Sequence, residues 1–301
     1  MFRKKKSLKI YLLINMVVEH LIISGGGPVF GLYVYGILFH LYTNNKIDID
    51  NIKTIYGCSA GSIIGGLICL KYDWEELTNY IIGKPWDKIV DISPEHLIHL
   101  PSDKGVLDRK FFEEIFNTLL LAKELSIDIT LEQLYNYSNI DFHLFTVKVN
   151  TFELIDLSHK THPNLKVIDA IYMSSAIPFI FKPVKHLESY FIDGAMIKNF
   201  PFDEFKLSNM DVNEDSIFAI TLNMVKADFS CHSMSLIEYA SFLYKNQLLL
   251  LDKQNYQAKN TIRVTLDSTK VFNFLSIFKD PLMREIIVKT ESLKYINVND
   301  S

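Results

Sequence analysis

The stretch I-K-T-I-Y-G-C-S-A-G-S-I-I-G-G-L-I-C-L, residues 52–70, carries the pattern that decides the fold. Residues 52–56 are mostly apolar or β-branched and predict a short strand. Residues 57–61 have a glycine at each end and predict a tight turn, and the apolar residues after them predict a helix over 62–70. A strand, a turn and a helix in direct succession form the repeating unit of an α/β fold.

The same unit occurs once more, closer to the N-terminus. Residues 20–24 form an apolar run, the glycine-rich S-G-G-G-P-V-F-G follows at 24–31, and the apolar residues over 30–41 predict a helix. Two such units in a row predict two parallel strands with helices packed beside them.

Alternating and apolar segments continue along the chain. We expect strands over residues 142–149, 152–157, 190–192 and 217–222, and a helix over 167–175 that ends before Pro178. The alternation of strands and helices predicts an α/β fold in which a mixed sheet lies between helices.

The chain divides into three expected parts. Residues 1–19 are an N-terminal extension, residues 20–222 a catalytic core, and residues 223–301 a mostly helical part packed on the core, with helices over 235–251 and 281–295. The extension begins with basic residues and an apolar run, as a secretory signal does, but it lacks a small-residue cleavage site and is too short to span a bilayer as a helix. A role in targeting or at a membrane surface is the alternative, so we expect a cytoplasmic protein or one peripheral on an intracellular membrane.

Composition excludes several classes of protein. A hydrophobic fraction of 49% with 22% charged residues indicates a packed core. The net charge of -4 gives no general basic surface for phosphates, so we expect no nucleic-acid partner. Cys58, Cys69 and Cys231 are odd in number and lack metal-ligand spacing, which predicts neither a disulfide framework nor a zinc site and favours a reducing compartment.

The turn G-C-S-A-G places Ser59 between a predicted strand and a predicted helix. A nucleophilic serine occupies this position in the G-x-S-x-G turn, where Gly57 and Gly61 keep side chains away from the neighbouring strand and helix. The start of the helix also favours negative charge close by. The alternative is an ordinary helix start with a capping serine.

The glycine triplet Gly25, Gly26 and Gly27 lets backbone N–H groups approach an oxyanion or a phosphate closely. A nucleotide-binding loop is one alternative, but the triplet lacks a G-K-[ST] ending, and Phe30 occupies the last glycine position of the G-x-G-x-x-G pattern. The other alternative is a turn that only closes a strand-helix unit.

The motif I-D-G-A puts Asp193, Gly194 and Ala195 at the end of a predicted strand. An aspartate at a strand end can reach a serine at another strand end of the same sheet. An Asp-Gly pair by itself is also typical of an ordinary turn.

In this order, the three motifs resemble the patatin-like phospholipase family. The segments S-S-A-I-P-F-I-F-K-P-V at 174–184 and D-G-A-M-I-K-N-F-P at 193–201 are similar to that family's segments before and after its catalytic aspartate. The likeness covers about residues 20–222. It implies a three-layer α/β/α fold with a central mixed sheet.

The resemblance also implies a mechanism. Ser59 is the nucleophile and Asp193 its base in a Ser-Asp dyad, which forms an acyl-enzyme and hydrolyses carboxylic esters of lipids. Gly57, Gly61, Gly194 and Ala195 support the two motifs. No metal or organic cofactor is implied, the substrate is a lipid or lies at a membrane surface, and protein partners are not indicated.

The glycine loop departs from the family pattern G-G-G-x-[KR]-G. Pro28, Val29 and Phe30 separate the triplet from Gly31, which adds one residue and removes the basic side chain. We expect Gly26 and Gly27 to donate to the oxyanion, while Gly25 shapes the turn.

Two other functions remain open from the residues. An α/β-hydrolase or acyltransferase with a Ser-His site would need a histidine late in the chain, and His232 is the only one after Asp193, although His186 could also approach the site. The altered glycine loop also suits a catalytically silent, lipid-binding relative.

Overall fold

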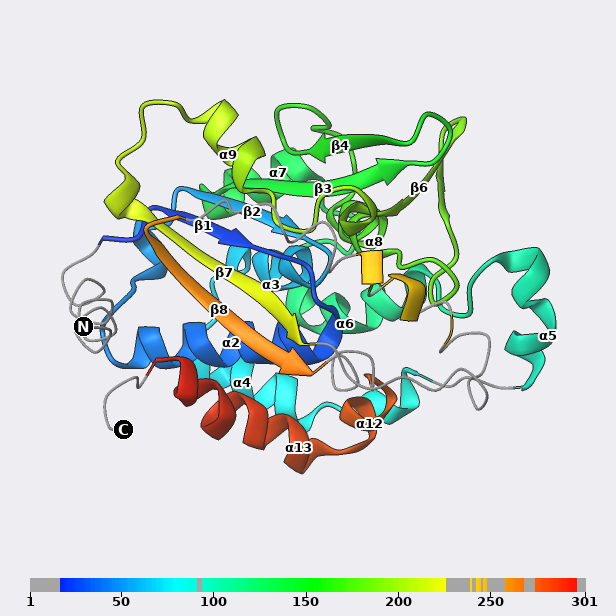
Figure 1. Ribbon diagram of the computed structural model, residues 1–301, viewed down its shortest axis with the longest axis horizontal. Helices are drawn as coiled ribbons and strands as arrows, with labels where there is room; N and C mark the ends of the chain where they lie inside the picture. Colours follow the sequence, from blue (N-terminus) through cyan, green and yellow to red (C-terminus); the bar gives the residue numbers. More distant parts are fainter. Residues whose placement is uncertain are drawn as a thin grey trace.

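The computed structural model describes residues 17–90, 94–225, 239, 242–244, 246–247, 258–267 and 274–296. Its framework is one eight-stranded sheet with the order β5-β6-β3-β2-β1-β7-β8, and β4 pairs with β3 outside that path (Figure 1). The strands are β1 (His20–Ile23), β2 (Thr54–Cys58), β3 (Asp141–Lys148), β4 (Glu153–Leu157), β5 (Val184–His186), β6 (Ser189–Asp193), β7 (Ile217–Val225) and β8 (Asn260–Asp267).

Helices surround this sheet. They are α2 (Gly27–Thr43), α3 (Ala60–Cys69), α4 (Trp74–Gly83), α5 (Pro94–Asp103), α6 (Arg109–Ala122), α7 (Leu131–Ser138), α8 (Val167–Ser175), α9 (Phe202–Ser208), α12 (Phe274–Lys279) and α13 (Pro281–Ile286). Helical turns continue from α13 through Tyr295, as expected for residues 281–295.

The sheet is mixed, which confirms the expected class. Strands β3, β2, β1, β7 and β8 run parallel to one another, whereas β4 and β6 pair antiparallel with β3, and β5 pairs antiparallel with β6. Every residue of β1 and β2 is buried. Their continuous apolar runs are typical of parallel strands that are covered on both faces.

Consecutive residues of β2 contact different layers. A Cβ at Gly65 of α3 would lie 3.0 Å from Ile55, so α3 packs on that face of the sheet. The ring of Tyr56, the next residue, meets Phe205 of α9 at 5.2 Å between centroids. Because side chains alternate along a strand, α3 and α9 cover opposite faces, and Figure 1 shows α2 and α9 on opposite sides of the sheet.

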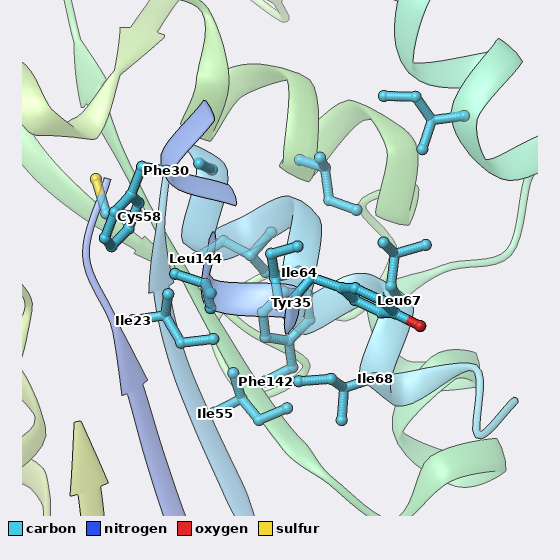
Figure 2. Packing of buried hydrophobic residues seen from close by; sticks show 14 of the residues in the cluster. Ile23, Phe30, Tyr35, Ile55, Cys58, Ile64, Leu67, Ile68, Phe142 and Leu144 are labelled. Atoms are coloured by element: carbon cyan, nitrogen blue, oxygen red, sulfur yellow. The ribbon is translucent and has the colours of Figure 1, made fainter. Parts of the chain in front are cut away.

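The core between α3 and the sheet is closely packed. Figure 2 shows Ile55, Phe142 and Leu144 of the sheet beside Ile64 and Leu67 of α3. All five side chains are buried, and the helix lies so near that a Cβ at its glycine 65 would stand 2.6 Å from a β3 ring. The missing side chain at Gly65 therefore allows α3 to pack closely against β2 and β3.

The described residues after 222 contribute a strand to the central sheet as well as helices. β7 runs to Val225, and β8 pairs parallel with it from Asn260 to Asp267, so this part of the chain adds a strand to the central sheet. The expected helix over 235–251 and the extension over 1–19 lie largely outside the described residues, and the division at residue 222 stays a prediction. Within the described parts of the chain, no helix has both the length and the apolar character needed to cross a membrane.

Candidate active site

Ser59 alone makes the turn between β2 and α3. The strand ends at Cys58 and the helix begins at Ala60, so the turn is shorter than the expected 57–61. Ser59 has φ 53° and ψ -120°, a conformation with positive φ that non-glycine residues rarely adopt. Such backbone strain persists where the surrounding structure holds it, and it is common at functional sites.

The two glycines of the turn allow the close contacts that hold it. A Cβ at Gly57 would lie 2.7 Å from the carbonyl oxygen of Gly61. A Cβ at Gly61 would in turn lie 2.4 Å from the carbonyl oxygen of Ile23 in β1. Both positions therefore exclude any larger residue, as the motif predicted.

Three further serines brace the turn, and the motifs did not predict their roles. The N–H of Ser59 donates to Ser174 Oγ at 3.2 Å, and Ser174 Oγ donates to the carbonyl of Phe145 at 2.7 Å. Ser62 Oγ lies 2.7 Å from Ser174 Oγ, and Ser175 Oγ donates to the carbonyl of Ser59 at 3.0 Å. Ser174 and Ser175 lie in the segment 174–184, and the likeness of that segment to the family was the only sequence feature that drew attention to them.

Ser59 and Asp193 meet directly. Ser59 Oγ donates a hydrogen bond of 2.6 Å to Asp193 Oδ2, and the two residues are only 3% and 0% exposed. A short bond between a hydroxyl and a buried carboxyl group is the arrangement that a nucleophile and its general base require.

Strand pairing explains why these two residues meet. Phe145 of β3 pairs with both Cys58 of β2 and residue 156 of β4, so β2 and β4 lie on opposite sides of β3. The next residue, Thr146, pairs with β4 and with Asp193 of β6. β6 therefore lies on the β2 side of β3, beyond the end of β2, and runs toward it. The C-terminal ends of the two strands face each other, which brings Asp193 to Ser59.

The carboxyl group of Asp193 has three hydrogen-bond partners in the described structure. Besides Ser59, the N–H of Ala195 donates to Oδ1 at 2.9 Å, and the hydroxyl of Tyr244 bonds to the carboxyl group. Burial raises the pKa of Asp193 to about 7, although all three hydrogen bonds act to lower it. Gly194 allows the turn after Asp193, because a Cβ there would lie 2.2 Å from the carbonyl oxygen of Phe145.

The glycine triplet lies against this pair. A Cβ at Gly25 would stand 3.0 Å from Ser59 Cβ, and the N–H of Gly25 donates to the carbonyl of Asn199 at 3.0 Å. The N–H of Gly25 is thus already hydrogen-bonded and is not free to donate to an oxyanion. Gly26 is the N-cap of α2, and Gly27, with φ 71°, begins that helix, three residues earlier than expected.

The start of α2 offers the donors that the sequence predicted. The first N–H groups of a helix have no partner within it, so those of Gly26 and Gly27 are suited to an oxyanion. Their role remains a prediction. Asn199, from the segment after Asp193, was not expected here; its Oδ1 is buried without a hydrogen-bond partner in the described structure.

An apolar cavity of about 130 Å³ opens onto Ser59. Its wall comes mainly from α2, α3, α6 and the segment before β5, and includes Pro28, Leu32, Ile63, Ile64, Leu67, Ile81, Trp86, Phe111, Phe112, Ile115, Ile177, Ile180, Phe181 and Phe278. No sequence motif predicted this cavity, because its lining residues come from distant segments. An alkyl chain matches the chemistry of such a wall.

His186, one of the two histidines considered for a triad, is not among the hydrogen-bond partners of Ser59 or Asp193 in the described structure. The ring of His186 in β5 lies 6.4 Å from the ring of Phe191, between centroids, and His232 lies outside the described residues. In the described part of the chain, no group of histidine, cysteine and acidic residues is arranged to hold a metal ion.

Known proteins are similar to this chain in sequence. The sequence is 24% identical over 255 residues to the probable lipid hydrolase 463L of Invertebrate iridescent virus 6, in an alignment that covers 84% of each chain. It is 25% identical over 233 residues to a cGAMP-activated phospholipase of Escherichia coli (strain TW11681), covering 71% of this chain and 64% of that protein.

A solved structure supports the same fold. VipD from Legionella pneumophila superposes with a TM-score of 0.53 over 93% of this chain and 67% of that one, and its 14% sequence identity makes it a likeness of fold alone. The sequence pattern of the patatin-like phospholipases matches residues 21–206, which is more than half of the 301 residues and spans β1 through most of α9. The chain therefore belongs to the patatin-like phospholipase family.

Proposed function

We propose that this protein hydrolyses carboxylic esters of lipids through a Ser-Asp dyad and an acyl-enzyme. The observation that carries the proposal is the 2.6 Å hydrogen bond from Ser59 Oγ to Asp193 Oδ2 at the end of a strained turn. The apolar cavity beside Ser59 supports a substrate with an alkyl chain. A place at the surface of an intracellular membrane is part of the proposal, because such lipids are found there.

In the first half of the reaction, Asp193 accepts the Ser59 proton while Oγ attacks the ester carbonyl carbon. The N–H groups of Gly26 and Gly27 stabilise the negative charge that forms on the carbonyl oxygen. Asp193 then donates its proton to the leaving alcohol, and the acyl group stays on Ser59.

In the second half, water attacks the acyl-serine. Asp193 accepts a proton from this water, and the ester bond to Ser59 breaks. The proton returns to Ser59 Oγ, the fatty acid leaves, and the site is restored. Each proton transfer uses the same carboxylate, so the scheme needs no histidine.

A hydrolysis screen tests the proposal. Phospholipids, lysophospholipids, triacylglycerol and nitrophenyl esters of different chain lengths are offered to the wild type, to Ser59→Ala and to Ser126→Ala, which changes an exposed serine outside the site. We expect hydrolysis of at least one lipid ester by the wild type and Ser126→Ala, and none by Ser59→Ala.

Two outcomes would contradict the proposal. Hydrolysis that survives in Ser59→Ala would show that another residue is the nucleophile. Failure of a fluorophosphonate probe to label Ser59 in the folded wild type would favour the catalytically silent relative instead.

A variant that fills part of the cavity tests whether the acyl chain binds there. Ile64→Trp places a larger side chain in the wall beside Ser59. It should lower turnover of long-chain nitrophenyl esters much more than that of the acetate, because only a long chain needs the cavity. Equal losses for both esters would place the acyl chain elsewhere.

A further inference from the structure

Tyr244 belongs to a short helical segment that packs on the loop after Asp193. Residues 242–244 and 246–247 of this segment are helical, and Tyr244 is 8% exposed. Its hydroxyl hydrogen-bonds with the side chain of Asp193. Three residues later, Gln247 Nε2 donates to the carbonyl of Met196. Residues three apart lie on one side of a helix, so both bonds attach the same helical face to the Asp193 loop.

The other groups around the Asp193 carboxyl are few in the described structure. Ser59 and the N–H of Ala195 donate to it, and the thiol of Cys58, buried on β2, interacts with its charge. Glu204 of α9 interacts with Cys58 from farther away. None of these side chains carries a positive charge, so hydrogen bonds must stabilise the carboxylate form.

Tyr244 is suited to be a donor to that carboxylate. Burial, together with the charge of Asp193, raises the pKa of the Tyr244 hydroxyl well above its ordinary value. The hydroxyl therefore stays neutral at every pH at which Asp193 ionises, and it can donate its proton into the hydrogen bond.

We propose that Tyr244 is a positioning residue for the reaction: its hydroxyl donates to Asp193, holds the carboxyl group ionised and keeps it facing Ser59. This inference rests on the proposed Ser-Asp mechanism. In that mechanism only the ionised carboxylate can accept the Ser59 proton, so a donor that favours the ionised form sets the pH at which the enzyme becomes active.

Tyr244→Phe removes the hydroxyl and keeps the ring. Loss of a hydrogen bond to a charged group moves the pKa of that group by about one to two pH units. In the wild type we expect kcat/KM to rise with pH with a midpoint near the Asp193 pKa of about 7. In the variant this midpoint should move up by about one unit, so that activity at about pH 7 falls by about fivefold and largely recovers at alkaline pH.

The test is a pH profile of kcat and KM with a soluble nitrophenyl ester. Tyr239→Phe is the matched control, because Tyr239 is an exposed tyrosine five positions earlier in the chain. Gln247→Ala is a second variant that loosens the segment without touching Asp193, and it should shift the midpoint in the same direction if Tyr244→Phe proves too unstable to assay.

The outcomes separate this inference from the proposed function. An upward shift of the midpoint in Tyr244→Phe, with kcat/KM at alkaline pH unchanged, supports the role of Tyr244. An unchanged profile, or an equal loss at every pH, would show that Tyr244 has only a structural role. Activity that survives Ser59→Ala would reject the proposed function itself, whereas an unshifted profile in an enzyme that depends on Ser59 rejects only the role of Tyr244.

Discussion

Replacing Asp193 with asparagine should remove most of the activity and yet make the protein more stable at alkaline pH. Asp193 is fully buried, and burial raises its pKa from 3.8 to about 7. The folded protein therefore binds the carboxyl proton of Asp193 more tightly than the unfolded chain does. An asparagine side chain has nearly the same shape and can still accept from the N–H of Ala195, but it never becomes charged.

The sign of the effect follows from linkage. For a group whose pKa is raised on folding, stability is fully present below the unfolded pKa and is lost as the pH rises through the folded pKa. The shift from 3.8 to about 7 is about three units, and at about 1.4 kcal/mol per unit it costs the wild type about 4 kcal/mol by about pH 8. Less than half of this cost is already present at about pH 5, so the advantage of Asp193→Asn should grow by about 2–3 kcal/mol between these two pH values.

Urea unfolding at several pH values measures this difference. The fluorescence of Trp74 and Trp86, both buried, follows the loss of structure. With an m-value of about 2–3 kcal/mol per molar urea, the gap between the two midpoints should widen by about 1 M from about pH 5 to about pH 8. A gap that does not change with pH would show that Asp193 is not held with a raised pKa.

Asp141→Asn is the control of opposite sign. Burial alone would raise the pKa of Asp141, but hydrogen bonds and charge from His143 and Lys160 lower it to about 2. Its ionised form therefore stabilises the fold above the unfolded pKa, and that stability is lost as the pH falls toward about 2. Asp141→Asn should destabilise the protein near neutral pH, where Asp193→Asn stabilises it. If both variants moved in the same direction, a general effect of removing negative charge would explain the result.

Ser59→Ala and Asp193→Asn should each remove most of the activity, and the double variant should be little worse than either, because residues that act as one unit are not additive; losses that multiply in kinetic assays would contradict the dyad. Gly61→Ala should reduce soluble folded protein or turnover severely, because its Cβ would lie 2.4 Å from a β1 carbonyl oxygen, and a stable, fully active variant in circular dichroism and ester assays would refute this. His186→Ala and His232→Ala should each keep at least about a third of wild-type turnover, because the dyad needs no imidazole; a loss of several hundredfold in a folded His232 variant would instead favour a triad. EDTA should leave turnover unchanged, since the mechanism uses no metal, and inactivation reversed by added metal would disprove that.

The local parts of the fold followed from the sequence. The helix expected over residues 167–175 is present as Val167–Ser175, and the strands expected over 142–149 and 152–157 are present as β3 and β4, which pair with each other. Periodicity and glycine placement report on neighbours along the chain, and these elements depend on such neighbours. The element boundaries at Gly27 and Ala60 were missed by two or three residues, because a helix can begin inside a glycine-rich turn once tertiary packing holds it there.

The sequence by itself determined the chemistry available at the site: a serine in a turn flanked by obligatory glycines, an aspartate at a strand end, and a glycine triplet before a helix. The tertiary structure alone decided how these groups meet. Ser59 and Asp193 are 134 positions apart, and they touch because β6 continues along β3 where β2 ends. Tyr244 and the apolar cavity likewise come from segments that no local pattern connects. Side-chain periodicity fixes which face of an element is buried. The pairing of distant strands depends instead on the free energy of packing the whole chain. The sequence motifs therefore predicted the reacting groups, and the fold supplied their geometry.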